Sequence, residues 1–178
     1  GCYGSFRQSR KSATGSASRS GMIRKASWPC GESTLAYPAG LPIDASKGGC
    51  DCHPTCPDCV PGEWPWSKQI DSIPILPQDV VGEGREPYYV MKQRGLDHVI
   101  LMGVHTNMCI LNRTFSIKQM VRWGADIPLV RDLTDTMYNP NSPPYVSHEE
   151  GTRLVVQYIE KFWCPTVSSD EVLAAVRA

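Results

Sequence analysis

The C-terminal part of the chain alternates between continuous apolar runs and helical patterns. Residues 98–104 (HVILMGV) form a continuous apolar run, which is typical of a strand buried on both faces of a parallel sheet. Residues 127–130 and a short segment at 165–167 predict two further strands. The segments between these strands have helical spacing or helix-end signals. Strands that alternate with helices predict an α/β fold in which helices cover a parallel sheet.

Four helices are predicted in this region, and most of them have recognisable ends. They are expected over residues 83–94, 107–123, 148–163 and from 170 onward. Gly95 and Gly124 follow the first two, because glycine readily adopts the left-handed conformation that ends a helix. Thr106 is the expected cap of the second helix, and Ser147 with Glu150 forms a capping box for the third. On the third helix, one face collects the apolar residues Leu154, Val155, Tyr158, Ile159 and Phe162.

The N-terminal part of the chain lacks such a pattern. Eight prolines between residues 38 and 80 exclude a long helix there. Residues 1–37 carry six basic side chains against the single acid Glu32 and little apolar material, so we expect this segment to be disordered or loosely attached. No apolar stretch follows these basic residues, so we see no signal peptide. We therefore expect an α/β domain over residues 38–178, and the start at Gly1 indicates a fragment or a processed product.

The overall composition limits the classes of function. The 178 residues include 18 basic and 18 acidic side chains, so the whole chain has no positive field to hold nucleic acid or an anionic membrane. Hydrophobic residues make up 41%, which is enough for one buried core. No apolar run approaches the roughly 18 residues of a membrane span. We expect a soluble domain with no nucleic-acid or membrane partner, and the sequence indicates no cellular location.

A cysteine-rich loop lies at residues 50–59, in the sequence CDCHPTCPDC. Its four thiols are Cys50, Cys52, Cys56 and Cys59. Thiolates so close in sequence can share one structural zinc ion if the loop folds tightly. In an oxidising compartment they would instead form two local disulfides, and free thiols are a third alternative. Zinc and disulfides stay equally open, and either would staple a long loop that has little core of its own.

One segment carries recognisable chemistry, namely GVHTNMC at residues 103–109, where a predicted strand ends and a helix begins. In open parallel sheets, ligands bind at the carboxyl ends of the strands. The N–H groups and dipole of a helix N-terminus favour the thiolate form of a cysteine in the first turn. Cys109 is therefore a candidate nucleophile, with neighbouring N–H groups to hold an oxyanion. The alternative is a small buried side chain in the core.

The segment GLDHVILMGVHTNMCI, followed by a helix, a strand and RDLTDTMYN, resembles the isochorismatase-like cysteine hydrolases. That family includes nicotinamidases and N-carbamoylsarcosine amidases. The resemblance covers residues 68–167, the C-terminal part of that fold, and implies a Rossmann-like three-layer α/β architecture. It also implies a cis peptide at Val104–His105 and a nucleophilic role for Cys109. A small-molecule substrate, no required cofactor and a homo-oligomer follow from the same resemblance.

Two further catalytic residues of that family are not matched in this chain. The family's Asp ends an N-terminal strand, and residues 1–37 contain no apolar run that would form one. The family's Lys would lie shortly after residues 79–81, where Arg85 is the only cation and cannot shuttle a proton because its pKa exceeds ~12. Lys68 is the nearest lysine upstream. We therefore expect a fold that is incomplete at its N-terminus, through truncation, modified chemistry or lost catalysis.

Residues near Cys109 are the remaining candidates for the site. Oxyanion and pocket groups would come from Val104, His105, Thr106 and Asn107. After the next strand, Tyr138 and Asn139 would face the site or a neighbouring subunit.

For two acids and a histidine near this edge, a role outside the site is also open. Asp132 and Asp135 are pocket candidates, although carboxylates that cap loops are commoner. His148 begins a helix, where the dipole disfavours its charged form.

These observations favour a cysteine hydrolase-like domain that cleaves a small amide or related C–N bond. One alternative is a catalytically inactive fragment or interaction module of the same fold, since the family's Asp and Lys are unmatched. Another is an isochorismatase-type hydrolase, whose vinyl-ether chemistry needs no thiol nucleophile.

Overall fold

The computed structural model describes residues 40–46, 72–80, 82 and 84–178. Residues 72–80 belong to one compact unit and the other described residues to a second, so each is considered by itself. The expectations for residues 1–37, for the cysteine-rich loop at 50–59 and for Lys68 lie outside the described residues.

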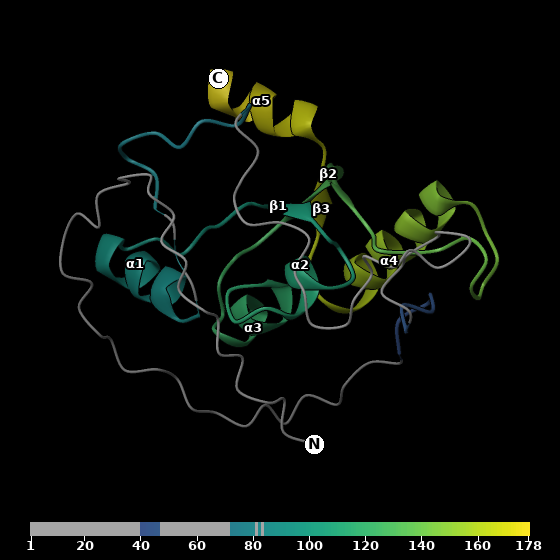
Figure 1. Ribbon diagram of the computed structural model, residues 1–178. Helices are drawn as coiled ribbons and strands as arrows, with labels where there is room; N and C mark the ends of the chain where they lie inside the picture. Colours follow the sequence, from purple (N-terminus) through teal and green to yellow (C-terminus); the bar gives the residue numbers. More distant parts are fainter. Residues whose placement is uncertain (1–39, 47–71, 81, 83) are drawn as a thin grey trace. The chain divides into compact units, whose positions relative to one another are not determined.

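The second unit is built on a three-stranded parallel sheet (Figure 1). Its strands are β1 (Leu101–Val104), β2 (Leu129–Asp135) and β3 (Thr166–Val167), in the order β1-β2-β3. β2 pairs in parallel with both neighbours, which confirms the predicted parallel α/β arrangement. β2 also runs well beyond residue 130, through a largely polar sequence that has no strand signal. Its pairing with β1 is irregular there, because Leu101 lies opposite Leu129 whereas Gly103 and Val104 lie opposite Thr134 and Asp135.

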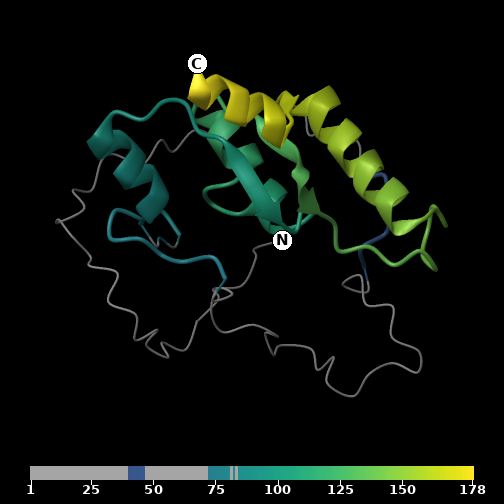
Figure 2. The ribbon, with the colours of Figure 1, turned by 90° about the horizontal axis from the view of Figure 1, so that it is seen from above.

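The described residues form five helices around this sheet. They are α1 (Glu86–Arg94), α2 (Cys109–Asn112), α3 (Ile117–Arg122), α4 (His148–Phe162) and α5 (Ser169–Arg177). The two views agree that α2 and α3 lie on one side of the sheet and α5 on the other (Figures 1 and 2). No helix among the described residues is long and apolar enough to cross a membrane.

The hydrophobic core joins β2 to α3 and α4. Leu129 of β2 is fully buried in one cluster with Ile117 of α3 and with Val155 and Ile159 of α4. The apolar spacing of α4 therefore predicts its buried face, although Phe162 at its end is 41% exposed.

Helix ends follow the capping signals only in part. Gly95 is left-handed, with φ of 65°, and ends α1 as predicted. Ser147 accepts a hydrogen bond from the Glu150 backbone at the start of α4. The Glu150 carboxylate binds Arg153, so we find only half of the predicted capping box. The helix after β3 forms as predicted, and Ser168 and Glu171 give it a complete capping box that the sequence prediction does not include.

The predicted helix over residues 107–123 is wrong, because the chain forms two short helices there. α2 has Met108 as its N-cap and no side-chain cap, so Thr106 does not cap it. Arg113 then turns to an extended conformation, with ψ of 167°. The Ser116 hydroxyl donates to the Arg113 carbonyl at 2.5 Å, and such local bonds compete with a continuous helix. Gly124 does terminate the pattern, with φ of 74°.

The expectation that the apolar run before Cys109 is buried on both faces is also wrong. Met102 and Val104 of β1 are 48% and 57% exposed, whereas Leu101 is half-buried. β1 is one of the two edge strands of the described sheet, and α5 contacts β2, the strand beside it. An apolar run predicts a strand, but the elements that cover its faces are set by the rest of the fold.

Candidate active site

A tight turn places Cys109 at the carboxyl end of β1. The peptide bond between Val104 and His105 is cis, where the family resemblance implies one. The His105 carbonyl accepts hydrogen bonds from the N–H groups of Met108 at 3.0 Å and Ile110 at 3.2 Å. Cys109 is a free, partly buried cysteine at the first position of α2. Its thiol therefore lies at the edge of the sheet where parallel folds bind ligands.

Thr106 fastens this turn, which we call the nucleophile turn (residues 105–108), to β2. Its backbone N–H donates to the Asp135 carbonyl at 2.8 Å. Its hydroxyl lies 2.6 Å from that of Thr134, which donates in turn to the Gly103 carbonyl at 2.7 Å. Because the single Thr134 proton is used on Gly103, the Thr106 hydroxyl must donate to Thr134. Thr106 is fully buried, so its side chain positions the turn.

Asn107 fastens the nucleophile turn to the segment after β2. Its amide nitrogen donates to the Met137 carbonyl, and its amide oxygen accepts from the Met137 N–H, both at 3.0 Å. Asn107 is 2% exposed, so this pair of hydrogen bonds is shielded from solvent. Of the four predicted pocket residues, Val104 is exposed and His105 half-buried. The contact of all four residues with a substrate stays a prediction.

Replacing Asn107 with alanine is expected to destabilise the domain by about 1–3 kcal/mol, because both polar groups of Met137 lose their partner. Urea unfolding measures this change. Asn141→Ala is the matched control, because Asn141 is exposed and should cost no more than a few tenths of a kcal/mol. Equal unfolding midpoints for Asn107→Ala and the unaltered chain would contradict this role for Asn107.

A polar cluster lies beside the turn, at the end of β2. Asp135 is the parallel partner of Val104 in the sheet. One of its carboxylate oxygens lies 2.8 Å from His148 Nε2 and accepts from the Thr152 hydroxyl at 3.0 Å. The other ring nitrogen of His148 lies 3.1 Å from the Tyr138 carbonyl.

This cluster favours the charged form of both titratable groups. Burial raises the pKa of Asp135, but the hydrogen bonds from His148 and Thr152 and the histidine charge outweigh it, so the pKa lies below 3.8. Burial also lowers the pKa of His148, but its bonds to Asp135 and Tyr138 and the charges of Asp135 and Glu149 outweigh that, so the pKa lies above 6.5. The expectation of a disfavoured histidine charge is wrong, because it left out the carboxylate on β2.

Tyr138 does not face the site or a neighbouring subunit, contrary to expectation. It is 2% exposed, and its hydroxyl donates to the Ser142 carbonyl at 2.9 Å and accepts from the Val146 N–H at 3.2 Å. Asp132 accepts hydrogen bonds from the backbone N–H and the hydroxyl of Ser169, at 2.8 and 2.5 Å, so its carboxylate is bound to the first residue of α5.

Of the two cations considered for the lysine position, Lys68 lies outside the described residues. Arg85 is the N-cap of α1. Within the described ranges, no group of three His, Cys, Asp or Glu residues is placed to hold a metal ion. The cysteine-rich loop lies outside those ranges, so its zinc and disulfide alternatives both stay open.

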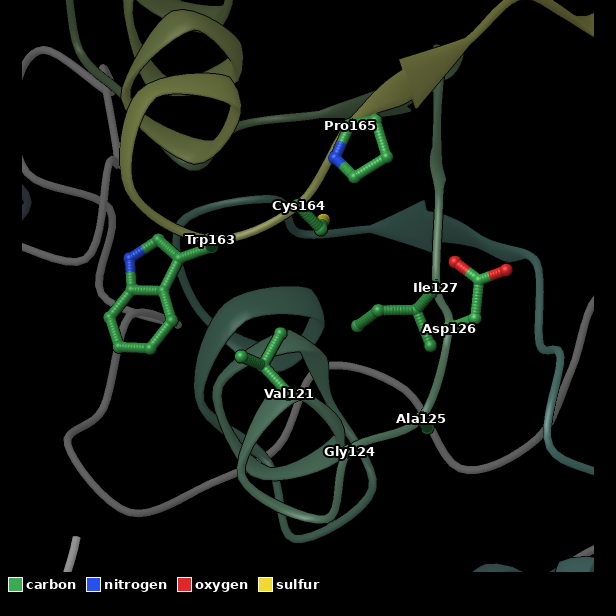
Figure 3. A pocket seen from close by; sticks show the side chains of 8 residues that line it. All are labelled: Val121, Gly124, Ala125, Asp126, Ile127, Trp163, Cys164 and Pro165. Carbon is green, nitrogen blue, oxygen red and sulfur yellow. The ribbon is translucent and has the colours of Figure 1, made fainter. Parts of the chain in front are cut away.

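A separate open pocket of about 240 Å³ lies at the amino ends of β2 and β3 (Figure 3). It is lined by Val121, Gly124, Ala125, Asp126, Ile127, Trp163, Cys164 and Pro165. Because the strands are parallel, this pocket is at the opposite edge of the sheet from Cys109. Burial raises the pKa of its Cys164 thiol to about 11, so this thiol is protonated and inert near neutral pH.

Comparisons with protein-family models, with curated proteins and with solved structures found no match.

Proposed function

We propose that this chain is a cysteine hydrolase-like domain that cleaves a small amide or related C–N bond, with Cys109 as the nucleophile. The observation that carries the proposal is the partly buried Cys109 thiol at the carboxyl end of β1, in a turn fixed to β2 by Thr106 and Asn107. Fixing the turn holds the sulfur in one place, which a nucleophile requires. The resemblance of the segment around Cys109 to isochorismatase-like cysteine hydrolases supports the same chemistry.

In this reaction the Cys109 thiolate attacks the carbonyl carbon, and the C–N bond then breaks. The amine or ammonia leaves with a proton, and water hydrolyses the resulting thioester. The N–H groups of Met108 and Ile110 already bind the His105 carbonyl, so the N–H of Cys109 itself and the backbone amides at Val104–His105 remain the candidates for oxyanion binding. The base is expected from the family's N-terminal strand and is matched to no residue here.

The short α2 changes one expectation about the thiol. A helix over residues 107–123 would place a full macrodipole behind Cys109, whereas α2 has four residues. The reactivity of Cys109 therefore depends more on access and on neighbouring groups than on a helix dipole. Half-buried His105, four residues before Cys109, is one such neighbour in sequence.

An inactive module of the same fold is the second candidate. Its support is the exposed apolar face of β1, together with Arg85 near the position of the family's lysine. In that case the nucleophile turn is kept as a connection between β1 and α2.

Thiol labelling separates the two cysteines of the described region. Iodoacetamide at neutral pH is expected to modify Cys109 in the folded chain and to leave Cys164 intact, because Cys164 is buried and its pKa is about 11. Peptide mass mapping gives the site of modification, and a urea-unfolded sample, in which both react, is the control. Protection of Cys109 equal to that of Cys164 would reject an accessible nucleophile.

A further inference from the structure

His148 has a hydrogen-bond acceptor at each ring nitrogen. Nε2 lies 2.8 Å from a carboxylate oxygen of Asp135, and Nδ1 lies 3.1 Å from the backbone carbonyl of Tyr138. A carbonyl oxygen cannot donate, and neither can an ionised carboxylate. A neutral imidazole has one N–H and can satisfy only one of these acceptors. Both bonds therefore form together only when His148 is an imidazolium.

The two acceptors bound by His148 belong to Asp135 and Tyr138, the first and last residues of a segment that is hydrogen-bonded to the nucleophile turn. The Asp135 carbonyl accepts from the Thr106 N–H at 2.8 Å. Met137, between the two acceptors in sequence, is paired through both its N–H and its carbonyl with the Asn107 side chain. Residues 135–138 are thus held on one side by the nucleophile turn and on the other by His148.

We infer that His148 is a positioning residue: as an imidazolium it clamps residues 135–138 against the nucleophile turn, and it releases them when it loses its proton. The clamp goes beyond the proposed hydrolase activity and stands whether or not Cys109 is a nucleophile.

The charges around His148 decide whether the clamp is held at low or at high pH. Asp135 faces it from β2 and Glu149 adjoins it on α4, and both are acids that favour the imidazolium. The connecting segment contributes the Tyr138 carbonyl, and the Thr152 hydroxyl donates to Asp135. Because these contacts raise the pKa of folded His148 above its ordinary value, the clamp is held at acidic pH and is lost as the pH rises through the folded pKa.

The test measures hydrogen exchange at the Met137 amide from about pH 5 to about pH 8, the range in which histidines titrate. After correction for intrinsic exchange, protection of the unaltered chain is expected to fall on the order of tenfold with rising pH, as a charge-assisted bond is lost. In His148→Gln, which cannot titrate, protection should not change with pH. NMR titration of the His148 ring should give a midpoint above 6.5.

A matched control removes a second histidine–aspartate pair of the same unit. His98 Nδ1 lies 2.9 Å from Asp126, with both side chains highly exposed, so His98→Gln should keep the pH dependence at Met137. Three results would each overturn the clamp: pH-independent protection in the unaltered chain, a His148 midpoint at or below 6.5, or loss of the effect in His98→Gln. The titration of the unaltered chain decides the matter even if His148→Gln fails to fold. None of these readouts uses hydrolysis, so failure of the clamp is distinct from failure of the proposed function.

Discussion

Gly151→Ala is expected to destabilise the domain by about 3 kcal/mol, at the upper end of the usual cost of overpacking. A Cβ at position 151 would lie 2.3 Å from Tyr138 Cδ1 and 2.7 Å from Cε1. The ring cannot move away cheaply, because Tyr138 is 2% exposed and its hydroxyl is bonded to Ser142 and Val146. Close packing of α4 on the segment after β2 therefore requires glycine at this position.

Urea unfolding measures the loss, and two companions make the result specific. Gly40→Ala has open space around the added methyl group and should leave stability within about 0.5 kcal/mol of the original. In a Tyr138→Ala background the clash is absent, so adding Gly151→Ala should cost far less than it does alone. Equal costs in the two backgrounds would show that the ring is not the reason for the glycine.

The second large effect is expected for Cys109→Ala, which should lower hydrolysis of a small amide by at least about 10⁴-fold. Loss of the attacking sulfur removes the covalent route, and the other groups of the site cannot replace it. The side chain is small and only partly buried, so the unfolding midpoint should change little.

Cys164→Ala is the control for this experiment, because that thiol lies in the pocket at the other edge of the sheet. It should keep full turnover even if it lowers stability. Retained turnover in Cys109→Ala would reject the nucleophile assignment. A lack of turnover in the unaltered chain, with Cys109 fully accessible to alkylation, would favour the inactive module.

Local signals in the sequence predict most of the C-terminal elements. The spacing of Val155, Tyr158 and Ile159 identifies the buried face of α4, and Ser147 marks where that helix begins. The short strand β3 and the helix after it also lie where the sequence places them. These features depend on side chains a few residues apart, which sequence patterns capture.

Features that depend on distant parts of the chain are not predictable in this way. The polar second half of β2 is a strand because β1 lies beside it, and no residue within Arg131–Asp135 indicates that neighbour. The exposure of Met102 and Val104 on β1 likewise depends on whether a distant part of the chain packs over that strand. The charge on His148 follows from Asp135, 13 positions away in sequence, which outweighs the local effect of the helix start.

The candidate site shows the same division. The strand–turn–Cys motif locates Cys109, and the family resemblance implies the cis peptide that the structure shows between Val104 and His105. The motif does not reveal that Thr106 and Asn107 are buried and bonded to β2 and Met137. Those bonds form between segments about 30 residues apart, as for Asn107 and Met137, and become visible only in the fold.

The most direct test of the central claim is to trap the covalent intermediate. The chain is mixed with a panel of small primary amides and ureas, quenched in acid during turnover, and analysed by peptide mass mapping. We predict an acyl or carbamoyl group on the peptide that contains Cys109, labile to hydroxylamine and absent from Cys109→Ala. Turnover without any adduct on Cys109, or with the adduct on a different cysteine, would contradict the account.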